Sequence, residues 1–111
     1  HAVAEATGSW DLGLRLIAPR IRSLALKNFR WKAARPLAPE TVPADEGLVP
    51  WKQFAGLAEA AGLAVPASVH CEWPTFSAAE AELDVAAKKR LAIARMGAER
   101  TFFQELFTAA G

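Results

Sequence analysis

The sequence predicts an α/β fold in which short parallel strands alternate with helices. Two short apolar runs, residues 21–26 and 67–73, are too short for helices and suit buried strands. A segment with helical periodicity, residues 51–61, lies between them, and this order implies parallel strands joined by a crossover. Two strands do not make a stable parallel sheet, because both of its faces must be covered. We therefore expect further strands from outside this chain.

A helix and a long loop flank the first predicted strand. Ser9 fits an N-cap, Asp11 lies in the first turn, where a carboxylate suits the helix dipole, and Pro19 ends the helix. After the strand, residues 29–48 contain three prolines and a glycine among mixed charges. This composition predicts a loop of a length that is usually functional or disordered.

The remaining elements are helices with clear start signals. Pro50 suits the first position of the helix between the strands, because its missing N–H would be unpaired there anyway. Ser77 and Glu80 form a capping-box pattern that opens a long helical stretch to about Ala109. Gly97 lies in the middle of that stretch and is expected to bend or split it.

Composition excludes several classes of protein. Among 111 residues, 13 Lys and Arg stand against 12 Asp and Glu, and a net charge of +1 argues against a nucleic-acid partner. No apolar run reaches the ~18–20 residues that a membrane-spanning helix needs. The single cysteine, Cys71, allows no internal disulfide framework. The chain opens on His1 rather than Met, so we expect a segment of a longer protein.

Polar side chains gather where the two predicted strands end. Ser68, His70 and Glu72 share one face of the second strand because side chains alternate along a strand. Buried polar groups need partners, and Lys27 at the end of the first strand is expected to pair with Glu72 across the sheet. The cluster is either a structural ion pair or a metal or acid–base site. Trp31, after the first strand, either lines a pocket or packs.

Three stretches of the chain carry a resemblance to a known family. They are PRIRSLALKNFRW at 19–31, VPADEGLVPWKQF at 42–54 and PASVHCEWP at 66–74. In this order they resemble the C-terminal part of the xylose isomerase-like (β/α)₈ barrels, the sugar phosphate isomerase/epimerase superfamily. The first is similar to a seventh strand ending in His-x-Lys-Asp, the second to a Pro-Leu-Gly-Glu-Gly loop, and the third to an eighth strand ending in Glu and an aromatic residue. The opening residues, 1–10, are similar to the segment after the sixth strand.

The resemblance implies a metal-dependent enzyme at the mouth of a barrel. Members of this superfamily bind a divalent metal, often manganese, magnesium, cobalt or zinc. They isomerise, epimerise or dehydrate sugars and polyols by moving a proton next to a carbonyl. By resemblance Glu72 is a metal ligand and the catalytic acid/base, and His1 is a second metal ligand that also contacts the substrate. The resemblance also implies Lys27 as a seventh-strand site residue and Glu46 with Gly47 as the loop motif, and Trp31 and His70 at the strand ends are expected to bind substrate with Lys27.

The chain departs from the family pattern at three positions. Ala25 stands where the seventh-strand metal histidine is expected, Asn28 replaces the following Asp, and Asp45 replaces the first Gly of the loop. A complete barrel needs roughly 250 residues, so residues 1–111 are expected to form a partial barrel domain with strands seven and eight. We expect that segment to be inactive in isolation.

Three functions remain open on these residues. The first is a segment of a sugar isomerase or epimerase, and the second is an inosose-dehydratase-like lyase on the same scaffold. The third is a degenerate, non-catalytic barrel piece that serves as a binding or assembly module, which Ala25 favours. The expected partners are a small sugar or polyol and the rest of the barrel or a second copy, with no nucleic acid or membrane. The expected location is the cytoplasm.

Overall fold

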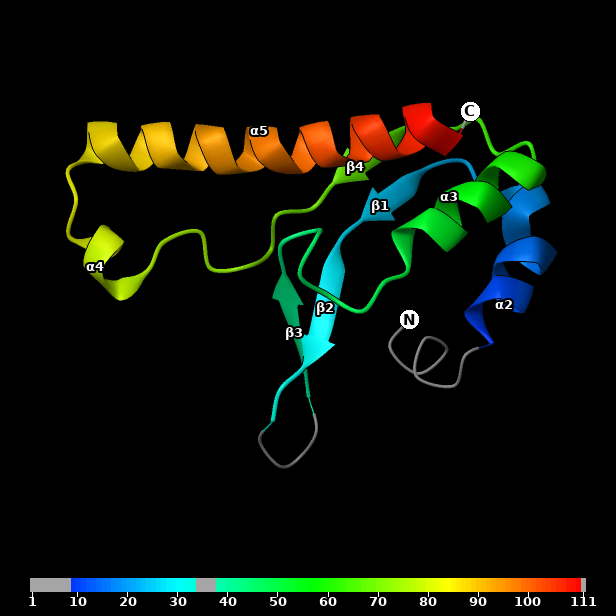
Figure 1. Ribbon diagram of the computed structural model, residues 1–111, viewed down its shortest axis with the longest axis horizontal. Coiled ribbons are helices and arrows are strands. Elements are labelled where there is room, and N and C mark those ends of the chain that lie inside the picture. Colours follow the sequence, from blue (N-terminus) through cyan, green and yellow to red (C-terminus); the bar gives the residue numbers. More distant parts are fainter. Residues whose placement is uncertain (1–8, 34–37, 111) are drawn as a thin grey trace.

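The computed structural model describes residues 9–33 and 38–110 and has mixed α/β architecture (Figure 1). His1 lies outside these residues. In chain order the elements are α2 (Trp10–Ile17), the 3₁₀ turn η1 (Ala18–Arg20), β1 (Leu24–Leu26), β2 (Asn28–Trp31), β3 (Pro39–Val42), α3 (Trp51–Ala60), β4 (Ala67–Val69), α4 (Ala78–Ala81) and α5 (Val85–Ala110).

The strand–helix–strand unit predicted from the sequence is present. Strands β1 and β4 pair in parallel with α3 between them in the chain, and Leu24 lies opposite Ala67. The Leu24 N–H donates to the Pro66 carbonyl at 2.9 Å, and the His70 N–H donates to the Leu26 carbonyl at 2.8 Å. Both strands are shorter than predicted, yet their carboxyl ends reach the same edge of the sheet.

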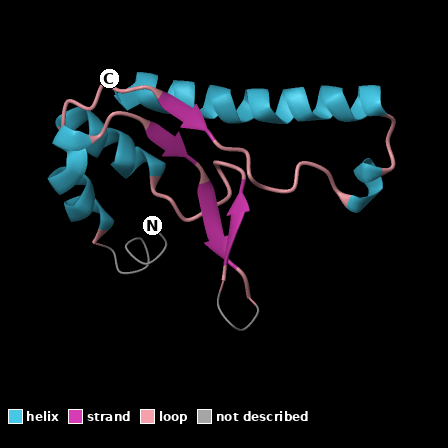
Figure 2. Ribbon diagram, turned by 180° about the vertical axis from the view of Figure 1, so that it is seen from behind, coloured by secondary structure: helices cyan, strands magenta, loops and turns pink. Residues whose placement is uncertain are grey.

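The prediction of a loop over residues 29–48 is wrong for the first part of this stretch, which forms an antiparallel hairpin. Strands β2 and β3 pair from Asn28 with Val42 to Trp31 with Pro39. Prolines suggested a loop, but Pro39 is the first residue of an edge strand, where no ladder hydrogen bond requires its N–H. Because β1 and β2 are separated by Lys27 alone, the chain passes there from one two-stranded sheet into the other (Figure 2).

A buried hydrogen-bond cluster holds the segment after β3 against the rest of the fold. Ala44 is at its centre, and its carbonyl accepts from Asn28 Nδ2 at 2.6 Å and from Trp51 Nε1 at 2.8 Å. Its N–H donates to both carboxylate oxygens of Glu99, on α5, at 3.0 and 3.1 Å. We call these four residues the Ala44 cluster. Their bonds join β2, α3 and α5 through one buried peptide segment.

Gly47 is required by the close approach of its loop to β2. A Cβ atom at this position would lie 2.1 Å from Asn28 Oδ1 and 2.6 Å from the Phe29 carbonyl oxygen. The same Oδ1 accepts from the Val49 N–H at 3.0 Å, so the loop is fastened on both sides of the glycine. The loop motif residue therefore has a demonstrable packing role.

The hydrophobic core lies between the β1–β4 sheet, α3 and the C-terminal half of α5. Trp51 and Phe103 pack edge-to-face with ring centroids 4.7 Å apart. Leu26 from β1 is buried beside them, while Val69 from β4 packs on the same cluster. In both strands, the apolar side chains that alternation places on one side therefore face this core.

The helix predicted from Ser77 to about Ala109 is interrupted, and the break lies before Asp84 rather than at Gly97. Ser77 and Glu80 make both bonds of the capping box, which confirms this start signal, but α4 ends after one turn. Asp84 then accepts from the Ala87 N–H at 2.8 Å and so caps the start of α5. Gly97 lies within α5, which continues through it.

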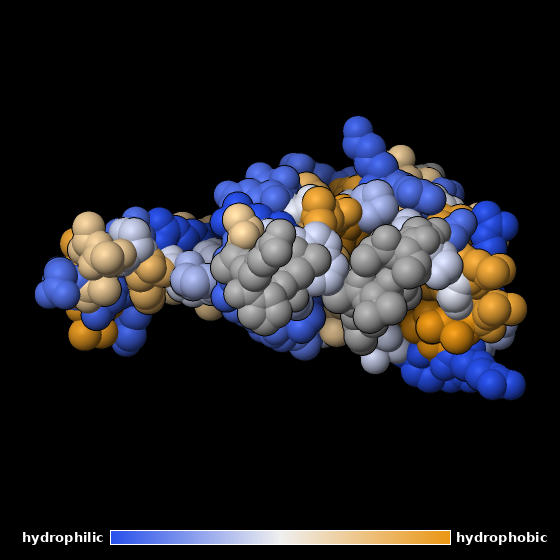
Figure 3. Space-filling view, turned by 90° about the horizontal axis from the view of Figure 1, so that it is seen from below, coloured by the Kyte–Doolittle hydropathy of each residue, from blue (hydrophilic) through white to orange (hydrophobic). Residues whose placement is uncertain are grey.

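Parts of two helices present apolar side chains to solvent. Over α2 the exposed residues are Leu12, Leu16 and Ile17, and apolar surface gathers at that end of the molecule (Figure 3). The first half of α5 extends away from the sheets (Figure 1), and Ile93 is 73% exposed there. Within the described part of the chain, no helix is both long and apolar enough to cross a membrane.

Candidate functional site at the strand ends

The strand-end cluster consists of Lys27, Ser68, His70 and Glu72. Lys27 follows β1 directly, and the other three lie on one face of β4 and its extension. Since the strands run in parallel, all four side chains meet at one edge of the sheet, which is the usual place for chemistry in α/β folds. The expected pairing of Lys27 with Glu72 is confirmed, with Nζ donating to Oε2 at 2.8 Å.

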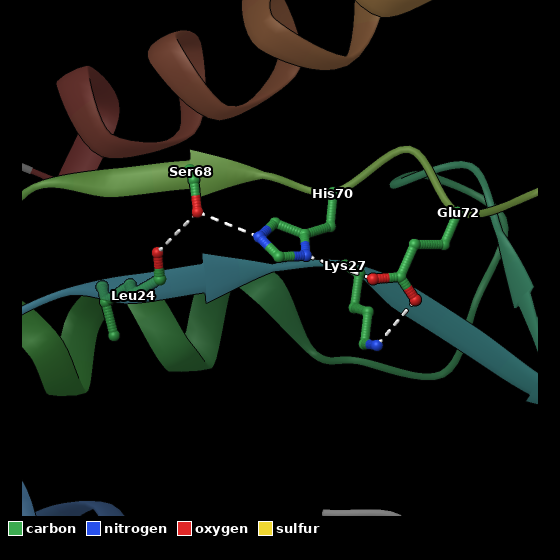
Figure 4. A network of polar contacts seen from close by, with 5 residues as sticks. All are labelled: Leu24, Lys27, Ser68, His70 and Glu72. Carbon is green, nitrogen blue, oxygen red and sulfur yellow. Dashed lines mark hydrogen bonds and ion pairs between the residues drawn. The ribbon is translucent and has the colours of Figure 1, made fainter.

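The four side chains form one continuous line of polar contacts (Figure 4). His70 Nδ1 lies 3.1 Å from Glu72 Oε1, and His70 Nε2 lies 3.0 Å from Ser68 Oγ. The Ser68 hydroxyl also lies 3.3 Å from the Leu24 carbonyl oxygen on β1. The imidazole therefore bridges a hydroxyl and a carboxylate.

The expectation that these groups are buried is wrong. The exposed fractions of the side chains are 46% for Lys27, 39% for His70 and 49% for Glu72. The core covers the opposite face of the β1–β4 sheet, and this face is left open to solvent. Hydrogen bonds from Lys27 and then His70 lower the pKa of Glu72, so this carboxyl is ionised at neutral pH.

The cluster borders a hollow of about 630 Å³ between α2, the β1–β2 run and the start of α3. Lys27, His70 and Glu72 lie on its wall. An apolar concavity with a few convergent polar groups is the usual form of a small-molecule site. The remaining wall is largely apolar and includes Trp10, Phe29, Trp51 and Phe54.

The other site residues expected from the sequence do not join this line of contacts. Trp31 packs edge-on against Phe29 at 5.5 Å between ring centroids, on β2. Glu46 is exposed in the loop before α3, and Gly47 contacts Asn28. The candidate His1 falls outside the described residues.

The cluster does not make a metal centre from the described residues. They contain no group of three or more His, Cys, Asp and Glu side chains placed to hold a metal ion. Glu72 and His70 supply one carboxylate and one imidazole, and the Lys27 ammonium already engages Glu72 Oε2. A divalent cation usually takes four or more ligands, so these two donors do not suffice.

Two functional features were missed by the sequence reasoning. Ser68 was placed on the polar face but not among the site residues, although its spacing from His70 was the available signal. Asn28 appeared only as a departure from the family Asp, whereas its buried amide organises the following loop.

Burial raises the pKa of the Cys71 thiol, and the Glu99 carboxylate raises it further. The raised pKa keeps this thiol protonated and weakly nucleophilic at neutral pH.

Comparison of the chain with protein-family models, with curated proteins and with solved structures found no match.

Proposed function

We propose that the chain is a segment of a cytoplasmic sugar isomerase or epimerase of the (β/α)₈ class, comprising its last two strand–helix units. The observation that carries the proposal is the meeting of Lys27 and Glu72 at the carboxyl ends of two parallel strands. A base and a cationic hydrogen-bond donor side by side suit the removal of a proton next to a carbonyl.

The proposed reaction uses the charges of the cluster. Glu72, ionised because its pKa is lowered, accepts the proton from the carbon next to the carbonyl of an open-chain sugar. The substrate oxygen takes the place of Glu72 Oε2 as the partner of the Lys27 ammonium, which then stabilises the developing enediolate. His70 holds Oε1 and orients the carboxylate during the transfer.

The resemblance also implies a divalent metal, with Glu72 as one ligand. The described residues do not hold such a metal alone, so its other ligands would have to come from outside the described part of the chain. No step of the proposed proton transfer is assigned to the metal.

The proposal is tested by exchange of carbon-bound hydrogen with solvent. The protein, expressed at the full length of its gene with added manganese, is incubated in D₂O with aldoses, ketoses, their phosphates and an inosose. We expect NMR to show deuterium entering the position next to the carbonyl of one of these substrates. Glu72→Gln should lower the exchange rate by about 10²- to 10⁴-fold, because it removes the base.

Glu105→Gln is the matched control, since it removes an exposed carboxylate on α5, away from the strand ends. We expect it to exchange at the rate of the unmodified protein. Exchange in none of the sugars, or equal exchange in Glu72→Gln, contradicts the proposal. Loss of water from the inosose would identify the lyase instead.

A further inference from the structure

We propose that Ser68, His70 and Glu72 form a nucleophilic triad that accepts acyl groups from activated esters. This goes beyond the proposed isomerase function and requires neither a sugar nor a metal. Ser68 is the nucleophile, His70 the general base and Glu72 the positioning residue for the imidazole. The inference starts from their geometry, because such triads are recognised by the contacts and roles of their members rather than by sequence order.

The distances meet the requirements of a triad. A nucleophile and its base should lie within hydrogen-bond reach, and the base should be oriented by a third group. Ser68 Oγ lies 3.0 Å from His70 Nε2, and Glu72 Oε1 lies 3.1 Å from His70 Nδ1. Each ring nitrogen therefore faces the group that its role requires (Figure 4).

Hydrogen-bond chemistry assigns the tautomer of the neutral ring. The Glu72 carboxylate can only accept, so Nδ1 carries the proton that the ring donates to it. In neutral imidazole the other nitrogen is then an acceptor, and Nε2 faces the Ser68 hydroxyl with its lone pair. The alternative acceptor for that hydroxyl, the Leu24 carbonyl oxygen, is further away at 3.3 Å. This is the protonation pattern that general-base activation of serine needs.

The framework around the triad holds it in place and leaves the serine accessible. Lys27 binds the second oxygen of Glu72 at 2.8 Å. The backbone N–H of His70 donates to the Leu26 carbonyl and holds the residue on β1. Ala25 lies directly opposite Ser68 in the parallel register, and both residues are exposed. An ester carbonyl can therefore approach the serine beside a methyl group rather than a large side chain.

Stability does not explain this arrangement. Ion pairs between exposed side chains contribute little to folding because water and salt screen them. Glu72 is about half exposed, and its partners Lys27 and His70 are exposed to a similar degree. Folding stability therefore gives no reason for this alignment of contacts, whereas a reactive site does.

The proposed reaction has two steps, which are acylation of Ser68 and hydrolysis of the acyl ester. Ser68 Oγ attacks the ester carbonyl carbon while its proton passes to His70 Nε2, and the carbon–oxygen bond to the leaving alcohol breaks as that proton is delivered to the alcohol. The product is an acyl ester on Ser68. Water then attacks this ester, His70 again carries the proton, and the carboxylic acid leaves as the serine hydroxyl is restored.

The test uses 4-nitrophenyl acetate with the protein expressed at the full length of its gene. We expect release of 4-nitrophenolate and a mass increase of one acetyl group that peptide mapping places on Ser68. Ser68→Ala and His70→Gln should each lower ester cleavage at least ~10-fold, toward the background rate. Ser23→Ala is the matched control, because Ser23 is also exposed just before β1, and it should react like the unmodified chain.

A second measurement separates reactivity from folding. The unmodified chain in concentrated urea should lose the Ser68 acetylation, and Glu72→Asp should retain more of it than Glu72→Gln. Acetyl groups on lysines or on His70 alone, or equal cleavage in Ser68→Ala, would overturn the triad. Ser68 acetylation without sugar exchange would contradict only the isomerase proposal, and sugar exchange without Ser68 acetylation would contradict only the triad.

Discussion

Two polar clusters lie near the junction of β1 and β2, and they are opposite in character. The Ala44 cluster is buried, with Asn28 only 2% exposed, and its bonds run from side chains to the backbone N–H and carbonyl of one residue, Ala44. The strand-end cluster is open to solvent, and Lys27, His70 and Glu72 bond side chain to side chain. Burial makes the first cluster important for stability, because unpaired buried polar groups are costly. Exposure leaves the second free to meet a ligand.

The largest loss of stability is expected at Gly47. Gly47→Ala would place a Cβ atom 2.1 Å from Asn28 Oδ1, so the loop must move and the bonds of Asn28 weaken. We expect the free energy of unfolding to fall by about 3 kcal/mol. Chemical denaturation measures it, with Gly56→Ala on α3 as control, where nothing lies within 4 Å. That control should be slightly stabilising, and an equal effect of both changes would contradict the role of Gly47.

A smaller loss is expected at Trp51. Trp51→Phe removes the Nε1 donor to the Ala44 carbonyl, which keeps its bond from Asn28. The expected loss is about 1–2 kcal/mol, from the hydrogen bond and the reduced ring volume. Trp31→Phe keeps an aromatic ring against Phe29 and should change the unfolding free energy much less. The reverse order in denaturation experiments would contradict a stabilising role for the buried hydrogen bond of Trp51.

The stability of the fold is expected to depend on pH through the partly exposed ion pair between Glu80 and Arg95. Two hydrogen bonds from Arg95 lower the pKa of Glu80 to about 2, and the bond from Ser77 adds to this. Because the pKa in the folded state is depressed, the stabilisation is complete above the ordinary value of 4.5 and is lost as pH falls toward about 2. NMR titration should show the Glu80 midpoint rising in Arg95→Met. An unchanged midpoint would contradict the pairing.

The smallest effect on stability is expected for Lys27→Met. Lys27 is the main cause of the lowered pKa of Glu72, so the Glu72 midpoint should rise in an NMR titration. The contribution of this pair is present above the ordinary carboxyl pKa and fades as pH falls below it. Since both groups are exposed, we expect the melting temperature to change less than in Trp51→Phe. A larger fall in melting temperature than that of Trp51→Phe would contradict the expectation that the exposed cluster stabilises the fold less than the buried one.

Local patterns predicted the parts of the molecule that depend on neighbouring residues. Strand alternation and the parallel order placed Lys27 beside Glu72, and the capping-box pattern of Ser77 and Glu80 located the start of α4. The break before α5 was missed because helical periodicity continues past Asp84, whose side chain begins a new helix instead.

The features that were missed depend on contacts between distant residues. The hairpin is closed by pairing of β2 with β3, in a stretch whose prolines favoured a loop. Glu99 reaches the Ala44 N–H across 55 positions of the chain, and no short-range pattern marks either residue. The exposure of the strand-end face was also unpredictable, because it depends on what covers the sheet.

Helix α5 has a consequence for how the molecule moves. It is one continuous helix, but only its second half, with Phe103 buried, packs on the core, while its first half lies outward and is tied to the preceding segment by Arg95. Amide protons along it should therefore exchange with solvent in two groups. Those near Ile93 should open by local fraying, and those near Phe103 only when the core itself unfolds.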